Sequence, residues 1–154
     1  MRLVKLVLFS GIITMIFGCE VDDICTETVL TPKLIIRFYD SSQTNTPKSV
    51  SHLYVWAESK DSLYNDVTTD SIALPLDTHL DETKYLLSSN AVIDTLYLSY
   101  ERQEIYVSRS CGLKFNFELN TTTHLSSHWS DSFSTVLIPQ SIKDESAAHI
   151  KIYH

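Results

Sequence analysis

The sequence predicts an all-β fold: a single antiparallel β-sandwich, immunoglobulin-like in general architecture, with about seven to nine short strands. Three observations favour this class. Apolar residues recur at alternate positions over short stretches, which is the period of a strand with one buried face. Segments rich in Ser, Thr, Asn and Asp separate these stretches and favour turns. A helical apolar period nowhere persists beyond about two turns.

Five short strands can be assigned directly from this alternation. In chain order they are 33–39, 52–58, 71–76, 84–88 and 149–154. In the first, Leu34, Ile36 and Phe38 share one face, and in the last we expect Ile150 and Ile152 to point inward. The segments between them, including KDSLYNDVTTD, are expected to be turns and loops.

The segment DTLYLSYERQEIYVS (94–108) is predicted to form a hairpin. Pairing Leu98 with Val107 and Tyr100 with Ile105 places the apolar residues of both strands on one face. A shift of one residue would expose the apolar set of one strand, so we expect this register to be firm.

The turn of this hairpin is expected at Arg102 and Gln103, as a two-residue turn or a four-residue loop around them. Neither residue is Gly or Asn, which weakens the two-residue version. The same register makes Tyr97 and Tyr106 diagonal neighbours on the outer face. Paired exposed aromatics offer a large contact area, so this pair is the candidate binding surface.

The first 18 residues have the layout of a secretory signal peptide. Arg2 and Lys5 give a positive start, residues 6–17 form an apolar core, and Gly18 is small. The core is too short for a good membrane-spanning helix, which needs about 20 apolar residues. The predicted organisation is therefore a lipoprotein signal peptide (1–18), a tether (19–32) and a β-sandwich domain (33–154).

Cys19 follows this apolar core directly, where a bacterial lipoprotein is cleaved and acylated. We expect lipid, including palmitate, at Cys19, because two or more acyl chains hold a soluble domain stably on a membrane. The alternative is an ordinary signal peptide with a chance cysteine at the cut. Phe17 departs from the small residue usual two positions before such a cysteine.

Cys25 and Cys111 are the remaining cysteines. In an oxidising compartment a leftover pair usually forms a disulfide bond, and this is the prediction; two free buried thiols are the alternative. Cys111 shares its parity with the apolar residues of the predicted strand 111–119 and is expected to point into the core. The pair lacks the C-x-x-C spacing of a redox site.

Composition excludes several function classes. Without the signal peptide the chain has 12 − 2 = 10 basic residues against 19 acidic ones, which argues against nucleic acid and against electrostatic docking on anionic lipid. After residue 18 the only glycine is Gly112, so a phosphate-binding loop or a dinucleotide fingerprint is excluded. No cofactor is expected. Gly112 lies within a predicted strand, which indicates a bulge or a close backbone approach.

The candidates for chemistry are weak. His124, His128 and Asp131 have a spacing that would converge on a metal only in a helix. The surrounding TTTHLSSHWSD is rich in Ser and Thr, so we expect solvated side chains and no metal site. No serine has a His or Asp partner suggested by spacing, and no catalytic residue is predicted.

Four segments, DDIC, TPKLIIRFYD, SCGLKF and HIKIYH, behind this signal resemble a family of small uncharacterised lipoproteins from Bacteroidota, a domain of unknown function. The resemblance implies an envelope location and supplies no catalytic or ligand residues. In that phylum acidic residues after the lipidated cysteine favour surface export, and Glu20, Asp22 and Asp23 fit loosely. Three triplets, 61–63, 70–72 and 94–96, also resemble the phylum's O-glycosylation sites.

The expected function is a non-catalytic binding or assembly module. We expect it to be held in the outer membrane by its N-terminal lipid, facing the periplasm or the cell surface. Its partner would be an envelope protein or a glycan. The alternative is an envelope hydrolase with a site built from scattered residues.

Overall fold

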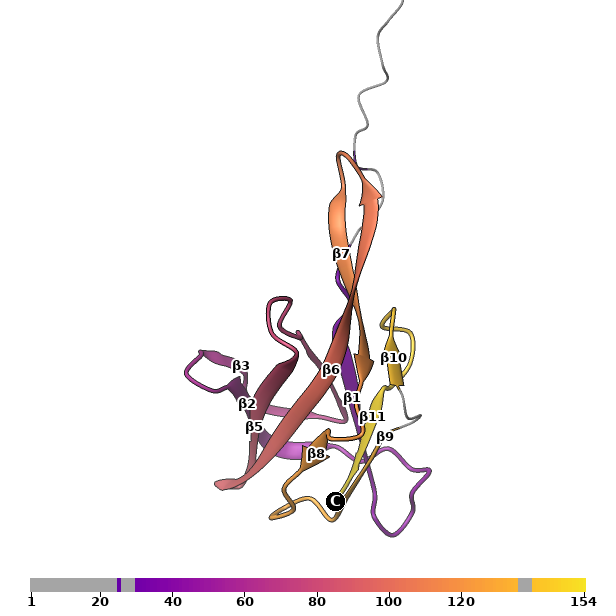
Figure 1. Cartoon of the computed structure of the whole chain (residues 1–154). Coiled ribbons are helices and arrows are strands. Elements are labelled where there is room, and N and C mark those ends of the chain that lie inside the picture. Colours follow the sequence, from indigo (N-terminus) through magenta and orange to yellow (C-terminus); the bar gives the residue numbers. More distant parts are fainter. Residues whose placement is uncertain (1–24, 26–29, 136–139) are drawn as a thin grey trace, which may run out of the picture.

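The computed structural model describes residues 25, 30–135 and 140–154 and has eleven β-strands and no helix among them. The strands form two sheets, which confirms the all-β sandwich (Figure 1). The strands are Leu34–Tyr39 (β1), Val50–Ala57 (β2), Ser62–Thr69 (β3), Ser71–Leu74 (β4), Glu82–Ser89 (β5), Val92–Ser108 (β6), Gly112–Leu119 (β7), His124–Leu125 (β8), Ser132–Thr135 (β9), Gln140–Ile142 (β10) and Ile150–Tyr153 (β11).

The smaller sheet has the order β4-β1-β11-β9, and the larger has the order β10-β7-β6-β5-β2-β3, with β8 paired to β6. All pairings are antiparallel except that of β1 with β11, which is parallel. This central pair brings the first and last strands of the domain side by side. Ile36 lies opposite Ile150, and Phe38 lies opposite Ile152. The predicted inward faces are confirmed, since all four side chains are fully buried.

The core lies between the two sheets and is almost entirely apolar. Its members come from both layers: Leu34, Ile36, Phe38, Ile72, Leu74, Ile150 and Ile152 from the smaller sheet, and Leu53, Val55, Tyr85, Leu87, Leu96, Leu98, Tyr100, Phe117 and Leu119 from the larger. Burying each such side chain contributes about 1.5–3 kcal/mol, so this layer is the main source of stability.

The predicted hairpin within 94–108 is wrong, because this segment is one continuous strand, β6, of 17 residues. Its first half pairs with β5 and its second half with β7, so the strand has partners along its whole length. The ERQE segment contains no residue that a tight turn needs. Tyr100 and Ile105 are an odd number of positions apart and therefore lie on opposite faces instead of pairing.

The hairpin that does form joins β6 to β7 through residues 109–111, and it projects beyond the sandwich (Figure 1). Gly112, at its end, has φ +75°, a conformation that other residues rarely adopt. A side chain there would meet no atom within 4 Å, so backbone conformation and not space favours glycine. The β6–β7 register also shifts between Tyr106 and Ser108. The bulge predicted at Gly112 therefore lies close to it, but on the opposing strand, β6.

The strands outnumber the predicted seven to nine, because β3, β8, β9 and β10 lie in segments where no strand is predicted. Of these, β3 occupies KDSLYNDVTTD, which is expected to be a loop. β3 is an edge strand with largely exposed side chains, so its sequence carries no apolar alternation. Register shifts along its pairing with β2, and positive φ at His52 and Asp66, mark bulges that protect such an edge.

Among the described residues there is no helix with the length and apolar character needed to cross a bilayer.

Candidate functional site

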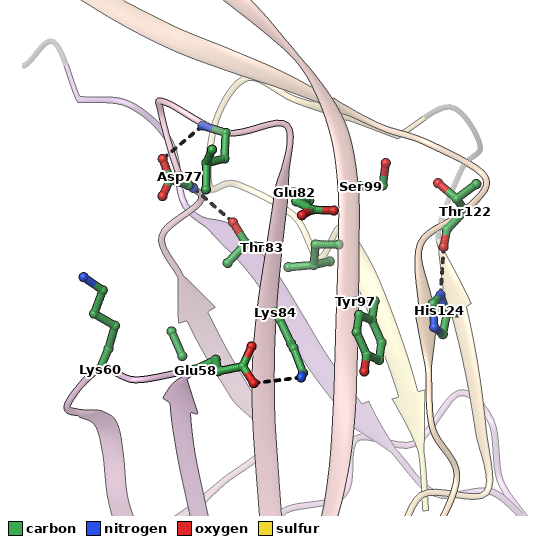
Figure 2. A pocket seen from close by; sticks show the side chains of 13 residues that line it. Glu58, Lys60, Asp77, Glu82, Thr83, Lys84, Tyr97, Ser99, Thr122 and His124 are labelled. Carbon is green, nitrogen blue, oxygen red and sulfur yellow. Dashed lines mark hydrogen bonds and ion pairs between the residues drawn. The ribbon is translucent and has the colours of Figure 1, made fainter.

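A groove of about 570 Å³ lies over the outer face of β5 and β6 (Figure 2). Its floor is formed by side chains that alternate with the buried ones: Lys84 lies opposite Tyr97, and Glu82 opposite Ser99. One wall is the segment after β2, with Glu58 and Lys60; a second is the loop after β4, with Asp77 and Leu80; a third comes from Thr122 and His124. The volume is in the range of pockets that bind small molecules.

Tyr97 lies at the centre of the groove between Lys84 and His124 (Figure 2). Its ring stacks on the imidazole of His124, with 4.6 Å between centroids and 16° between planes. The Lys84 ammonium lies 5.4 Å from the same ring centroid. The three residues meet because they are direct cross-strand neighbours on β5, β6 and β8. The Tyr97 ring is thus contacted by His124 and Lys84 of the protein itself, although 40% of the residue remains exposed.

Two charged groups of the groove, Lys84 and Asp77, are stabilised in their ionised forms. A hydrogen bond from Lys84 to Glu58, with 3.0 Å between Nζ and Oε1, raises the pKa of Lys84. The backbone N–H of His79, together with that of Leu80, lowers the pKa of Asp77. At neutral pH the Lys84 ammonium and the Asp77 carboxylate are therefore ionised and available to bind polar groups.

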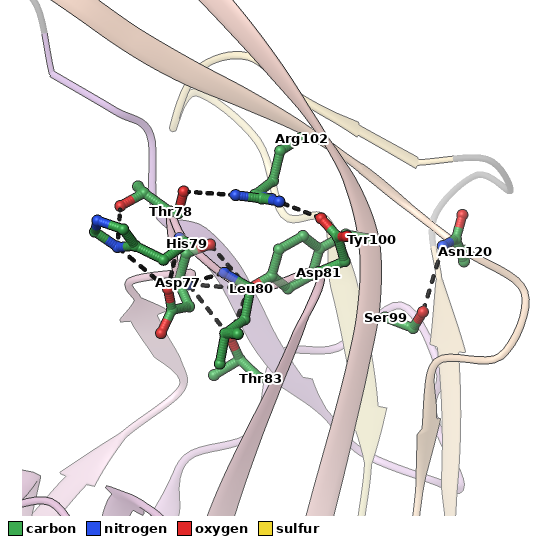
Figure 3. Close-up of polar contacts among 10 residues, drawn as sticks. All are labelled: Asp77, Thr78, His79, Leu80, Asp81, Thr83, Ser99, Tyr100, Arg102 and Asn120. Atoms are coloured by element: carbon green, nitrogen blue, oxygen red, sulfur yellow. Dashed lines mark hydrogen bonds and ion pairs between the residues drawn. The ribbon is translucent and has the colours of Figure 1, made fainter.

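The wall formed by residues 77–81 is held in place by β6 (Figure 3). The Tyr100 hydroxyl accepts a hydrogen bond from the N–H of Asp77 at 2.9 Å and donates to the carbonyl of the same residue at 3.1 Å. Arg102 donates from Nε to Asp81 at 2.6 Å and from Nη1 to the carbonyl of Thr78 at 2.8 Å. Because Tyr100 and Arg102 are fixed in β6, the wall is attached to the floor.

The opposite wall is attached to the same strand. The N–H of Asn120 donates to the carbonyl of Ser99 at 2.8 Å, and its side-chain amide donates to the Ser99 hydroxyl at 3.3 Å (Figure 3). Thr123 also bonds both to the N–H and to the carbonyl of Ser99. The groove is therefore preformed, which reduces the entropy that a ligand loses on binding.

The structure contains one polar cluster that the sequence analysis missed. Asp94 is fully buried, and its carboxylate accepts hydrogen bonds from side chains and backbone N–H groups of the segment 126–130. Burial raises the pKa of Asp94, but the hydrogen bonds from Ser130 and His128 outweigh this effect and lower it. The sequence contains a sign of this burial, because Asp94 is two positions before Leu96 and therefore lies on the same inward face of the strand.

This cluster resembles a catalytic triad in composition but not in connectivity. The Ser130 hydroxyl donates to Asp94 at 2.7 Å, and the His128 ring also bonds to Asp94, at 2.8 Å. A nucleophilic serine needs a histidine base as its own partner. Asp94 instead fixes the loop that follows β8. Its burial also removes the carboxylate of the triplet 94–96 from the surface.

The spacing of His124, His128 and Asp131 does not bring their side chains together. His124 stacks on Tyr97, whereas His128 bonds to Asp94. Within the part of the chain that the structure describes, no group of three His, Cys, Asp or Glu side chains is arranged to hold a metal.

The predicted disulfide between Cys25 and Cys111 is confirmed, with 5.0 Å between the Cα atoms. Cys111 lies at the turn of the projecting hairpin and is only half-buried, so the expected position in the core is wrong. The opposing sheet does not cover this end of β7, as the 50% exposure of Leu113 shows. Cys19 lies outside the described residues.

The predicted pairing of Tyr97 with Tyr106 is also wrong. The two lie nine positions apart on one strand, and therefore on opposite faces and about 30 Å apart. Tyr97 is in the groove, whereas Tyr106 is 64% exposed near the end of the hairpin.

Comparison with known proteins adds one finding. A family model described as "Family of unknown function (DUF6452)" matches residues 52–154. The match covers all residues that line the groove and also Cys111. No curated protein and no solved structure matches the chain.

Proposed function

We propose that this chain, which belongs to the DUF6452 family of unknown function, is a lipid-anchored envelope protein that binds a glycan and catalyses no reaction. The observation that carries the proposal is the preformed groove over β5 and β6, which charged and hydroxyl side chains line. The anchor would be lipid on Cys19, and the location would be the outer membrane, facing the periplasm or the cell surface, as in the lipoproteins of Bacteroidota that the sequence resembles.

Export is supported by two independent features. Cys19 follows a short apolar core that has basic residues before it. The disulfide between Cys25 and Cys111 is a bond that persists in oxidising compartments and is rare in the cytosol. Both features favour a protein that acts outside the cytoplasm.

The chemistry of the groove favours a glycan over a peptide. Its lining offers carboxylates, ammonium groups and hydroxyls, including Glu58, Lys84 and Ser99, which suit the many hydroxyls of a sugar. A peptide that binds by strand addition needs an open sheet edge. The floor strands β5 and β6 pair with each other and have further partners, so they offer no such edge.

The alternative of a hydrolase is less well supported by the same groups. A glycosidase needs a carboxylic acid whose pKa is raised so that it can donate a proton. Asp77 has a lowered pKa because of its backbone hydrogen bonds, and Glu58 is bonded to the ammonium of Lys84. Both are suited to accepting hydrogen bonds from a ligand.

The test is titration calorimetry of mature protein, purified from membranes, against envelope polysaccharides and their oligosaccharide fragments. Lys84→Ala removes a charged donor from the groove, and we expect affinity for the bound glycan to fall by roughly tenfold or more. The matched control is Lys143→Ala, an exposed lysine outside the groove, which leaves affinity unchanged. Equal affinity of the wild type and Lys84→Ala would reject this groove as the site, and release of new reducing ends would favour the hydrolase.

A further inference from the structure

The β6–β7 hairpin continues the inner face of the larger sheet beyond the point where the smaller sheet covers it. Within the sandwich, Tyr100 and Phe117 on this face are fully buried and pack edge to face, with 5.2 Å between ring centroids. Farther out, Tyr106 lies directly opposite Leu113 on the same face, and both are exposed. The alternation that builds the core thus leaves an uncovered apolar pair at the end of the hairpin.

A third apolar side chain belongs to the same end of the molecule. The incoming chain is bonded to the hairpin at Cys111 and again at Phe115, whose N–H donates to the Thr31 hydroxyl at 3.2 Å. Leu30 precedes Thr31 and is 71% exposed. Leu30 and Tyr106 are the two most exposed large hydrophobic residues in the described part of the chain. Leu30, Tyr106 and Leu113 together are here called the apolar tip.

The length of chain before Cys25 indicates what covers the apolar tip. Cys19 is six residues before Cys25, and six residues span at most about 20 Å when fully extended. Because Cys25 is bonded to Cys111, the distance from Cys19 to the end of the hairpin is restricted in the same way. With acyl chains on Cys19, the apolar tip is therefore held within about 20 Å of the lipid surface.

We infer that the apolar tip contacts the lipid surface, with Tyr106, Leu113 and Leu30 in the interfacial layer beside the anchor. This inference rests on the lipid anchor of the proposed function. Tyrosine is enriched at membrane interfaces because its ring is apolar and its hydroxyl is polar. The charged residues of the hairpin between 105 and 117 are Arg109 and Lys114, both basic. The four acids of the tether, Glu20, Asp22, Asp23 and Glu27, offset this charge, so apolar contact carries the inference.

This contact would set the orientation of the domain. Tyr97 in the groove and Tyr106 at the tip are separated along β6 by about 30 Å. With the tip on the lipid, the groove would lie at about that height above the surface, within reach of glycans around the membrane.

The experiment uses the mature lipidated protein in vesicles of phosphatidylethanolamine and phosphatidylglycerol whose acyl chains are brominated near the headgroup. Bromine quenches tryptophan fluorescence only at short range. The probe is Tyr106→Trp, with Leu113→Trp as a second probe, and the fluorescence of wild type, from Trp56 and Trp129, is subtracted. The matched control is Ile93→Trp, which is 43% exposed at the opposite end of the same strand.

We expect bromine to quench both tip probes several times more strongly than the Ile93→Trp control. Intact-mass measurement on the same samples tests the anchor separately. Lipidated protein with equal quenching at both ends would overturn the tip contact and leave the anchor standing. Protein without lipid mass would overturn the anchor and the inference with it. A fluorescence shift that follows protein concentration and not bromine would identify a second copy of the chain as the partner, which also overturns the inference.

Discussion

Cys111 at the turn of the β6–β7 hairpin is covalently joined to Cys25, with Cα atoms 5.0 Å apart and a separation of 86 positions in the sequence. The bond ties the segment that enters the domain to the element that projects farthest from it (Figure 1). Its position gives it two consequences. It restricts the unfolded chain, and it determines which end of the sandwich lies near the N-terminal cysteine.

Replacing both bridged cysteines by serine is expected to lower the free energy of unfolding by as much as about 4–5 kcal/mol, the chain-entropy value for a loop of this length. Urea unfolding of the double variant against wild type measures this. The matched control is Ser110→Ala, beside Cys111 in the same turn. A double variant as stable as the control would show that the disulfide contributes nothing to folding.

Asp94→Asn is expected to destabilise the protein by about 3 kcal/mol or more. The variant has no charged acceptor, and its side-chain N–H₂ group would face hydrogen-bond donors of segment 126–130. Glu104→Gln, an exposed carboxylate on the same strand, serves as the control. Since the folded pKa of Asp94 is lowered, its contribution is present above about pH 4, the unfolded value, and is lost as pH falls through the folded pKa. Equal melting temperatures of Asp94→Asn and the control would contradict this role.

Gly112→Ala is expected to cost about 1–2 kcal/mol, because alanine is strained at φ +75° although space for its side chain exists. Gly112→Asn is the informative companion, since asparagine tolerates this conformation better and should recover part of the loss. Thermal unfolding of the two variants provides the comparison. An alanine variant more stable than the asparagine variant would mean that backbone conformation is not the cause.

His149 is expected to make the fold sensitive to mild acid. Its buried ring accepts a hydrogen bond at Nδ1 from the N–H of Ile35, at 2.9 Å. Protonation of Nδ1 would break this bond, because two N–H donors would then face each other. Burial lowers its pKa, although Asp144 partly opposes the shift. The unfolded chain therefore binds the proton more readily, and stability is complete above about pH 6.5 and falls as pH drops from there through the folded pKa.

The variant His149→Asn keeps an acceptor near Ile35 and cannot titrate, so its melting temperature should depend less on pH between about 7 and 5. Part of the dependence should remain, because burial also lowers the pKa of His154. An unchanged pH dependence in the variant would rule out His149 as the titrating group.

Much of the fold was accessible from sequence because the core is built by simple alternation. Leu34, Ile36 and Phe38 in β1, and Ile150 and Ile152 in β11, were placed on the correct face by a period of two. The disulfide follows from counting cysteines in a chain whose first residues predict export. These inferences needed only local pattern and parity.

The errors arose where local pattern does not determine pairing. Alternation before and after residues 101–104 predicts two strands paired with each other, but β7 follows later in the sequence and pairs with the second half of β6. Edge strand β3 lacks an apolar face and was invisible to the same reasoning. Consequently the sequence predicts that Tyr97 lies on the surface. Its neighbours in the groove, Lys84 and His124, can be identified only when the strand order is known.

Photocrosslinking in intact cells is the sharpest test of whether the groove binds a glycan. A photoreactive amino acid replaces Ser99, on the floor of the groove, and in a control strain replaces exposed Lys143 outside it. After irradiation the protein is purified and its adducts are analysed by mass spectrometry. We expect carbohydrate adducts, removable by glycosidase digestion, at position 99 and not at position 143. A protein adduct specific to position 99, or identical adducts at both positions, would contradict this expectation.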